Sequence, residues 1–249
     1  MEFFELMDIS HRYLEILNPS SHEKILAVGD VLNLNTGSDN RVIDFGCGKG
    51  ELLALWAEKF GISGTGVDIS EQFCETAISR IKERNLDNRI NIVHANGAEY
   101  TTEAQDYNAG LCIGATFIWG GFRETIQALR KFVKPEGKLV IGEVYWLKND
   151  IPQEYLNGSA PPGTMYEHEL LQVANEEGYD IEYMVRASLD DWDRYNAGNW
   201  RGLVRWIHDN PDHPERQDII DHLRTNQDDY LRYEREYLGW AIYVLNPMM

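Results

Sequence analysis

Apolar residues are spaced in two different ways along residues 41–144. Five short runs are rich in apolar residues, which is the pattern of buried strands of about four to eight residues. These runs are 41–45, 64–69, 90–94, 109–113 and 138–144. Between them, apolar residues recur every three or four positions, as they do on one face of a helix. Strands that alternate with helices predict a parallel sheet with helices on both of its faces.

The pattern is less regular at the two ends of the chain. Residues 1–17 are amphipathic and predict a helical arm, and Ser20-x-x-Glu23 is a capping box that opens a second helix. Residues 149–164 contain several prolines and glycines, which predict a mobile connection rather than a helix. The remaining expected elements are a helix at 166–177, a strand at 179–187, helices at 188–209 and 211–238, and a strand at 240–245.

A glycine-rich turn follows the first strand. Gly46, Gly48 and Gly50 allow the backbone to turn sharply and to admit a ligand with no Cβ in the way. A helix that begins at this turn presents free N–H groups and a partial positive charge to an anionic group. Asp44 ends the first strand. Asp68 ends the second strand, eighteen residues after Gly50, where its carboxylate can accept from both hydroxyls of a ribose.

Two classes of ligand use this layout. A dinucleotide fingerprint requires G-x-G-x-x-G, but Glu51 occupies the position of its third glycine, which disfavours an oxidoreductase. The spacing is instead D-x-G-x-G-x-G over residues 44–50, followed by Asp68. This arrangement resembles the class I S-adenosylmethionine (SAM)-dependent methyltransferases. The resemblance implies a Rossmann-like, mostly parallel seven-stranded sheet whose last strand is antiparallel and lies at the edge.

Further segments are similar to the YjhP-like branch of small-molecule methyltransferases. They are residues 112–122 and 143–146, whereas the turn at 134–137 is similar to a Lys-Pro-Gly-Gly turn of the wider family. Asn96 stands where the family usually has Asp, and its amide can still accept from the adenine amine. The resemblance implies SAM as the cofactor and S-adenosylhomocysteine (SAH) as its product. The implied cofactor-binding residues are Asp44, Gly46, Cys47, Gly48, Gly50, Asp68, Ile69, Asn96, Gly97, Ala98 and Gly114.

Five of the candidate residues end successive strands. They are Asp44, Asp68, Asn96, Gly114 and Glu143. Ligands of open α/β sheets bind outside the carboxyl ends of the strands, so these residues predict one shared site.

The acceptor end of the site is predicted less directly. Glu143 is the candidate catalytic base or substrate anchor, and the alternative is a carboxylate that orients water or the methionine amine. His11 and Arg12 resemble a pair in the same branch and are candidate substrate-binding residues. Six aromatic residues are candidates for the wall of an apolar pocket, and the first four lie within the similar segments: Phe117, Trp119, Tyr145, Trp146, Trp192 and Tyr195. Trp119, Tyr145 and Trp146 are the ones assigned to the substrate.

Composition excludes several classes of binding partner. The net charge of −18 argues against a nucleic-acid partner. The three cysteines form no C-x-x-C pair and predict no metal site, and no run is long enough to span a membrane. The N-terminus lacks a basic signal-peptide start, so we expect a cytoplasmic protein. Nothing in the sequence indicates the oligomeric state.

Together these features predict a SAM-dependent methyltransferase that acts on a small molecule by in-line displacement. The predicted domain (1–249) consists of an N-terminal helical cap (1–34), a cofactor-binding core (35–147) and a C-terminal part with helical insertions (148–249). The alternative is a SAM- or SAH-binding regulatory or scaffold protein without turnover. The sequence identifies neither the acceptor nor the atom that is methylated.

Overall fold

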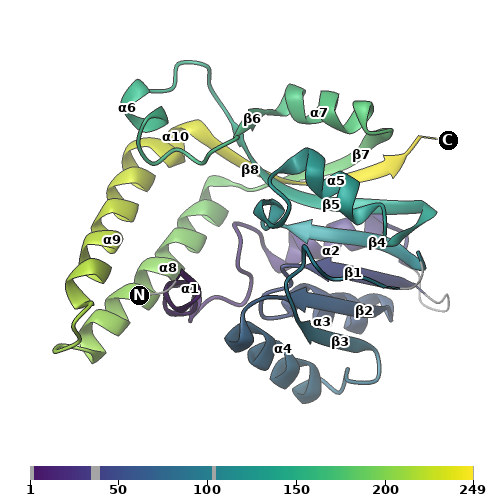
Figure 1. Cartoon of the computed structure of the whole chain (residues 1–249), viewed down its shortest axis with the longest axis horizontal. Helices are drawn as coiled ribbons and strands as arrows, with labels where there is room; N and C mark the ends of the chain where they lie inside the picture. The colour runs from purple at the N-terminus through teal and green to yellow at the C-terminus, as the bar shows by residue number, and fades with distance from the viewer. Residues whose placement is uncertain (1–2, 35–39, 103–104, 249) are drawn as a thin grey trace.

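An eight-stranded sheet forms the centre of the computed structural model, which describes residues 3–34, 40–102 and 105–248 (Figure 1). The strand order is β3-β2-β1-β4-β5-β8-β7, with β6 paired to β5. The strands are β1 (Arg41–Phe45), β2 (Ser63–Asp68), β3 (Ile90–His94), β4 (Tyr107–Ile113), β5 (Val133–Trp146), β6 (Met165–Tyr166), β7 (Tyr179–Arg186) and β8 (Leu238–Pro247).

Strand pairing confirms a mostly parallel sheet with an antiparallel last strand. β1 pairs in parallel with β2 and β4, so Asp44 lies beside Gly66 and Leu111. β8 pairs antiparallel with β5 and with β7. The expected place of the last strand at the edge is wrong, because β8 lies between β5 and β7. The apolar residues of β8 are buried throughout its first eight positions, which suits an interior strand.

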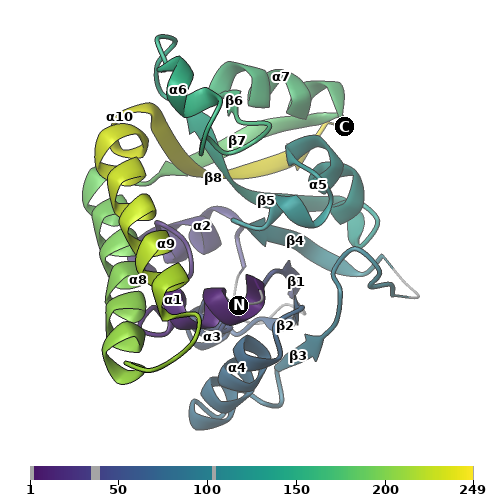
Figure 2. The same ribbon diagram turned by 60° about the vertical axis from the view of Figure 1, so that its left-hand side comes forward.

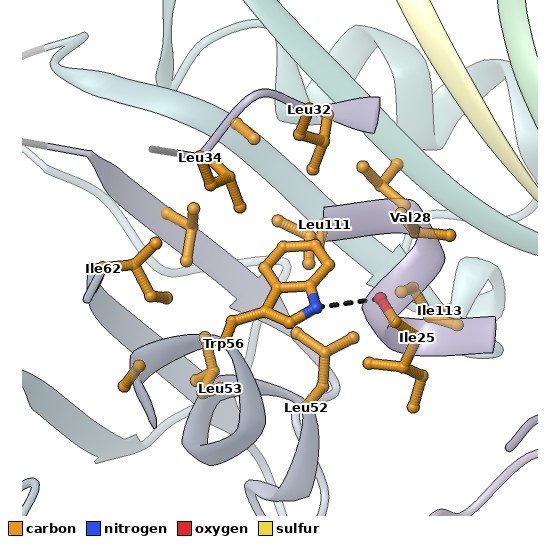
Figure 3. Close-up of a cluster of buried hydrophobic side chains, with 14 of the residues drawn as sticks. Ile25, Val28, Leu32, Leu34, Leu52, Leu53, Trp56, Ile62, Leu111 and Ile113 are labelled. Atoms are coloured by element: carbon orange, nitrogen blue, oxygen red, sulfur yellow. Dashed lines mark hydrogen bonds between the residues drawn. The ribbon is translucent and has the colours of Figure 1, made fainter. Parts of the chain in front are cut away.

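Alternate residues of a strand point to opposite sides of the sheet. Both faces of this sheet carry apolar residues, and helices cover both. Val42 faces a core formed with α2 (His22–Val31) and α3 (Glu51–Phe60). Its neighbour Ile43 faces a second core formed with α5 (Phe122–Leu129) and α7 (Glu167–Glu176). Figure 3 shows the first core around Trp56, whose indole N–H donates to Ile25 O at 2.9 Å. α4 (Glu71–Glu83) packs beside β2 and β3.

A separate group of helices lies beyond the carboxyl ends of the central strands (Figures 1 and 2). It consists of α1 (Phe3–His11), α8 (Leu189–Asp209) and α9 (Arg216–Asp229), which share a small apolar core. α1 crosses α8 at Gly202, where an added Cβ would lie 2.6 Å from Ser10 O and closer still to Ile9 O. The absence of a side chain at Gly202 therefore allows α1 to lie directly on α8.

Several local predictions need correction. Ser21, rather than Ser20, caps α2, since its hydroxyl accepts from the Lys24 N–H at 3.3 Å. The connection at 149–164 contains one helical turn, α6 (Gln153–Leu156). The helix expected at 211–238 is divided into α9, the π-helical segment η2 (Tyr230–Glu234) and α10 (Arg235–Tyr237). The predicted boundary between residues 34 and 35 adjoins an interval outside the described residues.

Candidate active site

A cavity of about 370 Å³ lies between the carboxyl ends of β1, β2 and β4 and the N-terminal arm. One wall comes from the glycine turn and the residues that follow these strands. The other comes from α1, the segment after it, and α8. The cavity therefore lies where the sequence predicts the shared site, and the arm forms part of its cover.

Most of the predicted cofactor-binding residues line this cavity. The first strand and its turn contribute Asp44, Gly46, Cys47 and Gly48. The ends of the next strands contribute Asp68, Ile69, Asn96, Gly97 and Gly114. His11 reaches it from α1, and among the six aromatic candidates Phe117 and Tyr195 line it.

The other predicted residues lie outside the cavity. Gly50 faces Ala77 of α4, and the Arg12 side chain is half-exposed, 3.9 Å from Asp8. Ala98 donates its N–H to the Asn96 side chain. The aromatic side chains of Trp119, Tyr145 and Trp146 pack against Phe45, Gly239 and Tyr155, respectively. Their predicted roles at the ligand stay predictions.

Glu143 also lies behind the cavity rather than in its wall. Its Oε1 accepts the Val144 N–H at 3.0 Å, and its carboxylate also bonds the Thr116 side chain. Burial raises the pKa of Glu143. The neighbours of Thr116, Ala115 and Phe117, do line the cavity. Glu143 is thus one residue removed from the space in which an acceptor would lie.

The backbone of the glycine turn is fixed by the end of β2. Gly46 donates its N–H to Val67 O at 2.8 Å, and Gly48 donates to Asp68 Oδ2 at 2.8 Å. Both glycines have positive φ, 69° and 53°. An added Cβ at Gly46 would lie 2.5 Å from the Cβ of Ala115, so a side chain there would close the turn against the end of β4. Asp68 therefore shapes the turn as well as facing the cavity.

Two buried carboxylates give the cavity its electrostatic character. Asp44 is fully buried, and within the described part of the chain no hydrogen-bond donor reaches its side chain. Burial and then repulsion from Asp68 raise the pKa of Asp44 to about 7. Burial also raises the pKa of Asp68, although N–H groups of Ser70 and Gly48 oppose this effect. An unpaired buried carboxylate favours a ligand that brings a positive charge.

Lys49 joins the two walls of the cavity, a role that the sequence did not indicate. Its side chain is buried and donates to three backbone carbonyls of the arm, His11 O at 2.8 Å, Leu14 O at 3.0 Å and Arg12 O at 3.1 Å. Burial lowers the pKa of Lys49. Its position inside a glycine turn gave no signal that its side chain would cross to the arm.

His11 and Tyr195 form a hydrogen-bonded pair in the second wall. The Tyr195 hydroxyl lies 3.0 Å from His11 Nε2, and His11 Nδ1 lies 3.0 Å from Met7 O. Because a carbonyl can only accept, Nδ1 carries the proton and Nε2 accepts from the Tyr195 hydroxyl. Burial lowers the pKa of His11 to about 4, so the imidazole is neutral near pH 7.

Several apolar residues of the arm line the cavity although the sequence did not single them out as site residues. Phe3, Phe4 and Met7 of α1 line the cavity, together with Phe73 of α4. Phe117, which also lines the cavity, is 70% exposed. The amphipathic pattern of residues 1–17 indicated a buried face, but not which of its residues would face a ligand.

One group of side chains has the spacing of a metal site. Ligand atoms of Glu15, His22 and Glu51 lie within 4.8 Å of one another. The Glu51 carboxylate, however, is held by Arg80 at 3.1 Å and by Arg84 at 2.8 Å. Two guanidinium groups already neutralise it, so this cluster carries no metal assignment.

Comparisons with known proteins agree with this geometry. Residues 42–137 match a methyltransferase domain family. The chain is 33% identical over 248 residues to the protein YjhP of Escherichia coli strain K12, covering 98% of this chain and 99% of that protein. A crystal structure of a SAM-dependent methyltransferase from Geobacter sulfurreducens, in complex with SAH, is 34% identical with a TM-score of 0.91 and covers 98% of both chains. Its counterpart from Thiobacillus denitrificans, also with SAH, is 31% identical with a TM-score of 0.89, covering 99% of this chain and 100% of that one.

The sheet, the glycine turn and the two carboxylates define a class I SAM-dependent methyltransferase, with SAM as its cofactor. The match to YjhP covers 98% of this chain, so it includes the arm and the C-terminal helices as well as the cofactor-binding part. Within that class, the chain belongs to the YjhP family. Every helix among the described residues is too short or too polar to serve as a membrane span.

Proposed function

We propose that this methyltransferase transfers the methyl group of SAM to a small molecule by in-line displacement. The observation that carries the proposal is the arm, which covers the cavity from within the same chain and leaves about 370 Å³ behind it. A covered cavity of this size suits SAM and part of a small acceptor better than a macromolecular segment. The net charge of −18 also disfavours a nucleic-acid acceptor.

The cofactor is assigned to residues of the first wall. The Asp68 carboxylate accepts the N–H groups of Gly48 and Ser70 at 2.8 and 2.9 Å and also bonds the Ile69 backbone, and since a carboxylate has about four acceptor sites it keeps capacity for a ribose hydroxyl. Asp44 has no donor among the described residues and suits the ammonium group of the methionine part. Ile69, Asn96 and Gly97 follow β2 and β3 and are proposed to hold the adenine.

The chain's contribution to the reaction is alignment and the exclusion of water. SAM supplies a methyl group on a sulfonium, which is already activated towards a nucleophile. Lys49 holds the arm over the turn, and the apolar residues of α1 reduce access of water to the cavity. If the nucleophile carries a proton, Glu143 is the sequence-based candidate for its acceptor. His11 is less suited to that role, because its Nε2 already accepts from Tyr195 and its pKa is lowered to about 4.

Incubation of the protein with a metabolite extract and methyl-labelled SAM tests the proposal. We expect mass spectrometry to detect a labelled product of low molecular mass, together with SAH. Labelling confined to proteins or nucleic acids would contradict the proposal, and SAM binding without any labelled product would favour the regulatory alternative. A cytoplasmic location and the division of the single domain at residues 34 and 147 stay predictions.

A further inference from the structure

A second cavity, of about 680 Å³, lies between the segment 13–22 and α8. Asn18 and Tyr195 line both this cavity and the cofactor cavity. Asn18 is held at the end of β4, where its amide donates to Ile113 O at 3.3 Å. The two spaces therefore meet at the end of β4, beside Gly114, which is one of the residues assigned to the cofactor.

The second cavity contains polar atoms that the described residues do not satisfy. The Ser20 side chain is 96% buried, and its hydroxyl has no hydrogen-bond partner there. The same holds for Oδ1 of Asn18. Buried polar groups are nearly always paired in folded proteins, so an unpaired hydroxyl at a cavity points to a ligand that pairs with it.

The charges around the cavity are positive on balance, in a chain with 41 acidic and 23 basic residues. The Arg201 guanidinium lies over the Tyr13 ring at 4.4 Å and has no carboxylate partner among the described residues. Arg194 donates to Asp191 at 2.7 Å and to Ser20 O at 2.9 Å.

Asp191 is also paired with Lys24, and the Glu15 carboxylate lies 3.7 Å from His22. Glu51 lies 3.2 Å from His22 as well, but Arg80 and Arg84 already neutralise it. Lys24, Arg194 and Arg201 thus outnumber the carboxylates of Asp191 and Glu15 even with His22 neutral. Of these three cations, Arg201 is the one without a carboxylate partner among the described residues.

We propose that the second cavity binds the methyl acceptor, and that the acceptor carries an anionic group, a carboxylate or a phosphate, held by Arg201 and the Ser20 hydroxyl. The guanidinium offers paired N–H donors to either group, and the hydroxyl adds a further donor. Asn18 and Tyr195 then stand where the acceptor extends from this anchor towards the cofactor cavity. The inference rests on the proposed function and adds the chemical class of its substrate.

The test uses the full chain saturated with SAH and three simple probes. Inorganic phosphate and benzoate represent the two anionic groups, and benzamide is the neutral counterpart of benzoate. Binding is followed by ligand-observed NMR in the unaltered protein, in Arg201→Gln, in Arg201→Lys and in Arg205→Gln. Arg205 is exposed one turn further along α8 and does not line the cavity, so it is the matched control.

We expect phosphate or benzoate to bind the unaltered protein and the Arg205→Gln variant, and benzamide not to bind. Arg201→Gln should weaken the anion about tenfold or more, and Arg201→Lys should restore part of the loss. Which of the two anions binds identifies the acceptor's group. No anion binding, equal binding of benzamide, or no effect of Arg201→Gln would each overturn the proposal.

SAH affinity, measured in the same proteins, separates this proposal from the proposed function. Unchanged SAH affinity in Arg201→Gln is expected, since Arg201 does not line the cofactor cavity. The labelled product from the extract supplies a second measurement. It should be retained by an anion-exchange resin, and Arg201→Gln should raise the KM for its formation about tenfold or more with little change in kcat. A neutral or cationic product would refute the acceptor class while leaving the methyltransferase activity intact.

Discussion

The two walls of the cofactor cavity are built from the chain in different ways. The wall made of the glycine turn and the strand ends comes from residues 44–118, in which the contributing residues lie at the ends of β1, β2 and β4 or in the segments that follow β1, β2, β3 and β4. The opposite wall comes from the two ends of the chain, α1 with the segment after it, and Tyr195 of α8. The first wall follows from local sequence, whereas the second exists only once α1 has packed on α8 and Lys49 has bound the arm.

Glu143, which lies behind the first wall, gives the test with the largest expected effect, because its role was inferred from its place near the end of β5. Glu143→Gln keeps the shape of the side chain and removes its charge. If Glu143 acts on the acceptor, turnover falls by about 10²-fold, the usual scale of a general base, while SAM affinity hardly changes. The measurement is methyl transfer beside titration calorimetry.

The structure gives this test a clear alternative. Glu143 bonds to Thr116 behind the cavity and does not line it. Full activity of Glu143→Gln would remove Glu143 from the reaction and would mean that the acceptor needs no carboxylate. Loss of SAM binding in proportion to activity would instead assign Glu143 to the cofactor.

Asp68→Ala should have the next largest effect, on the affinity for SAM and SAH. The substitution removes the proposed bonds to the ribose and also the acceptor of the Gly48 N–H. Losing hydrogen bonds to a charged group costs about 1.5–3 kcal/mol, roughly 10- to 100-fold in affinity. Titration calorimetry measures it, with Asp87→Ala, an exposed aspartate, as the control. Unchanged affinity of Asp68→Ala for SAM and SAH would contradict the assignment of Asp68 to the ribose.

Lys49→Met tests the connection between the two walls. Methionine retains much of the length of the lysine stem but cannot donate to His11 O, Arg12 O and Leu14 O. We expect the arm to open more often and SAH to leave about tenfold faster, since lids control the release of bound ligands. Stopped-flow fluorescence measures the release rate. Lys59→Met, which removes an exposed pair with Asp30, is the control. A release rate equal to that of the control would show that the arm does not retain the cofactor.

The sheet and the first wall could be predicted because their signals are local. The strand rhythm, Gly46, Gly48 and the spacing to Asp68 each depend on neighbouring residues, and the structure brings these residues to one cavity. The position of β8 within the strand order could not be predicted from local sequence, since an apolar strand suits any interior position of a sheet.

The second wall depends on contacts that no local pattern encodes. The Lys49 side chain meets carbonyls more than thirty residues away, and His11 meets Tyr195 across 184 residues. The close approach of α1 to α8 relies on Gly202, and from sequence alone a glycine inside a helix indicates only a low helix propensity. The identity of the residues that face the acceptor therefore required the structure.

The smallest predicted effect is a pH dependence of SAM binding that arises in the first wall. With its pKa raised to about 7, Asp44 is mostly neutral at pH 6 and half ionised at pH 7. A carboxyl whose folded-state pKa is raised makes the protein without SAM less stable as pH rises from about 4 to 7. The neighbouring thiols of Cys47 and Cys112, whose pKa values are also raised, stay neutral in this range, and Asp68 shifts in the same direction as Asp44. Because the ammonium group of SAM favours ionised Asp44, affinity for SAM should rise about fivefold from pH 6 to pH 7, with a proton released on binding.

Calorimetry in buffers of different ionisation enthalpy measures that proton. Asp44→Asn should bind more weakly at pH 7 and lose most of the pH dependence, whereas an affinity independent of pH in the unaltered protein would show that Asp44 is not the partner of the ammonium group.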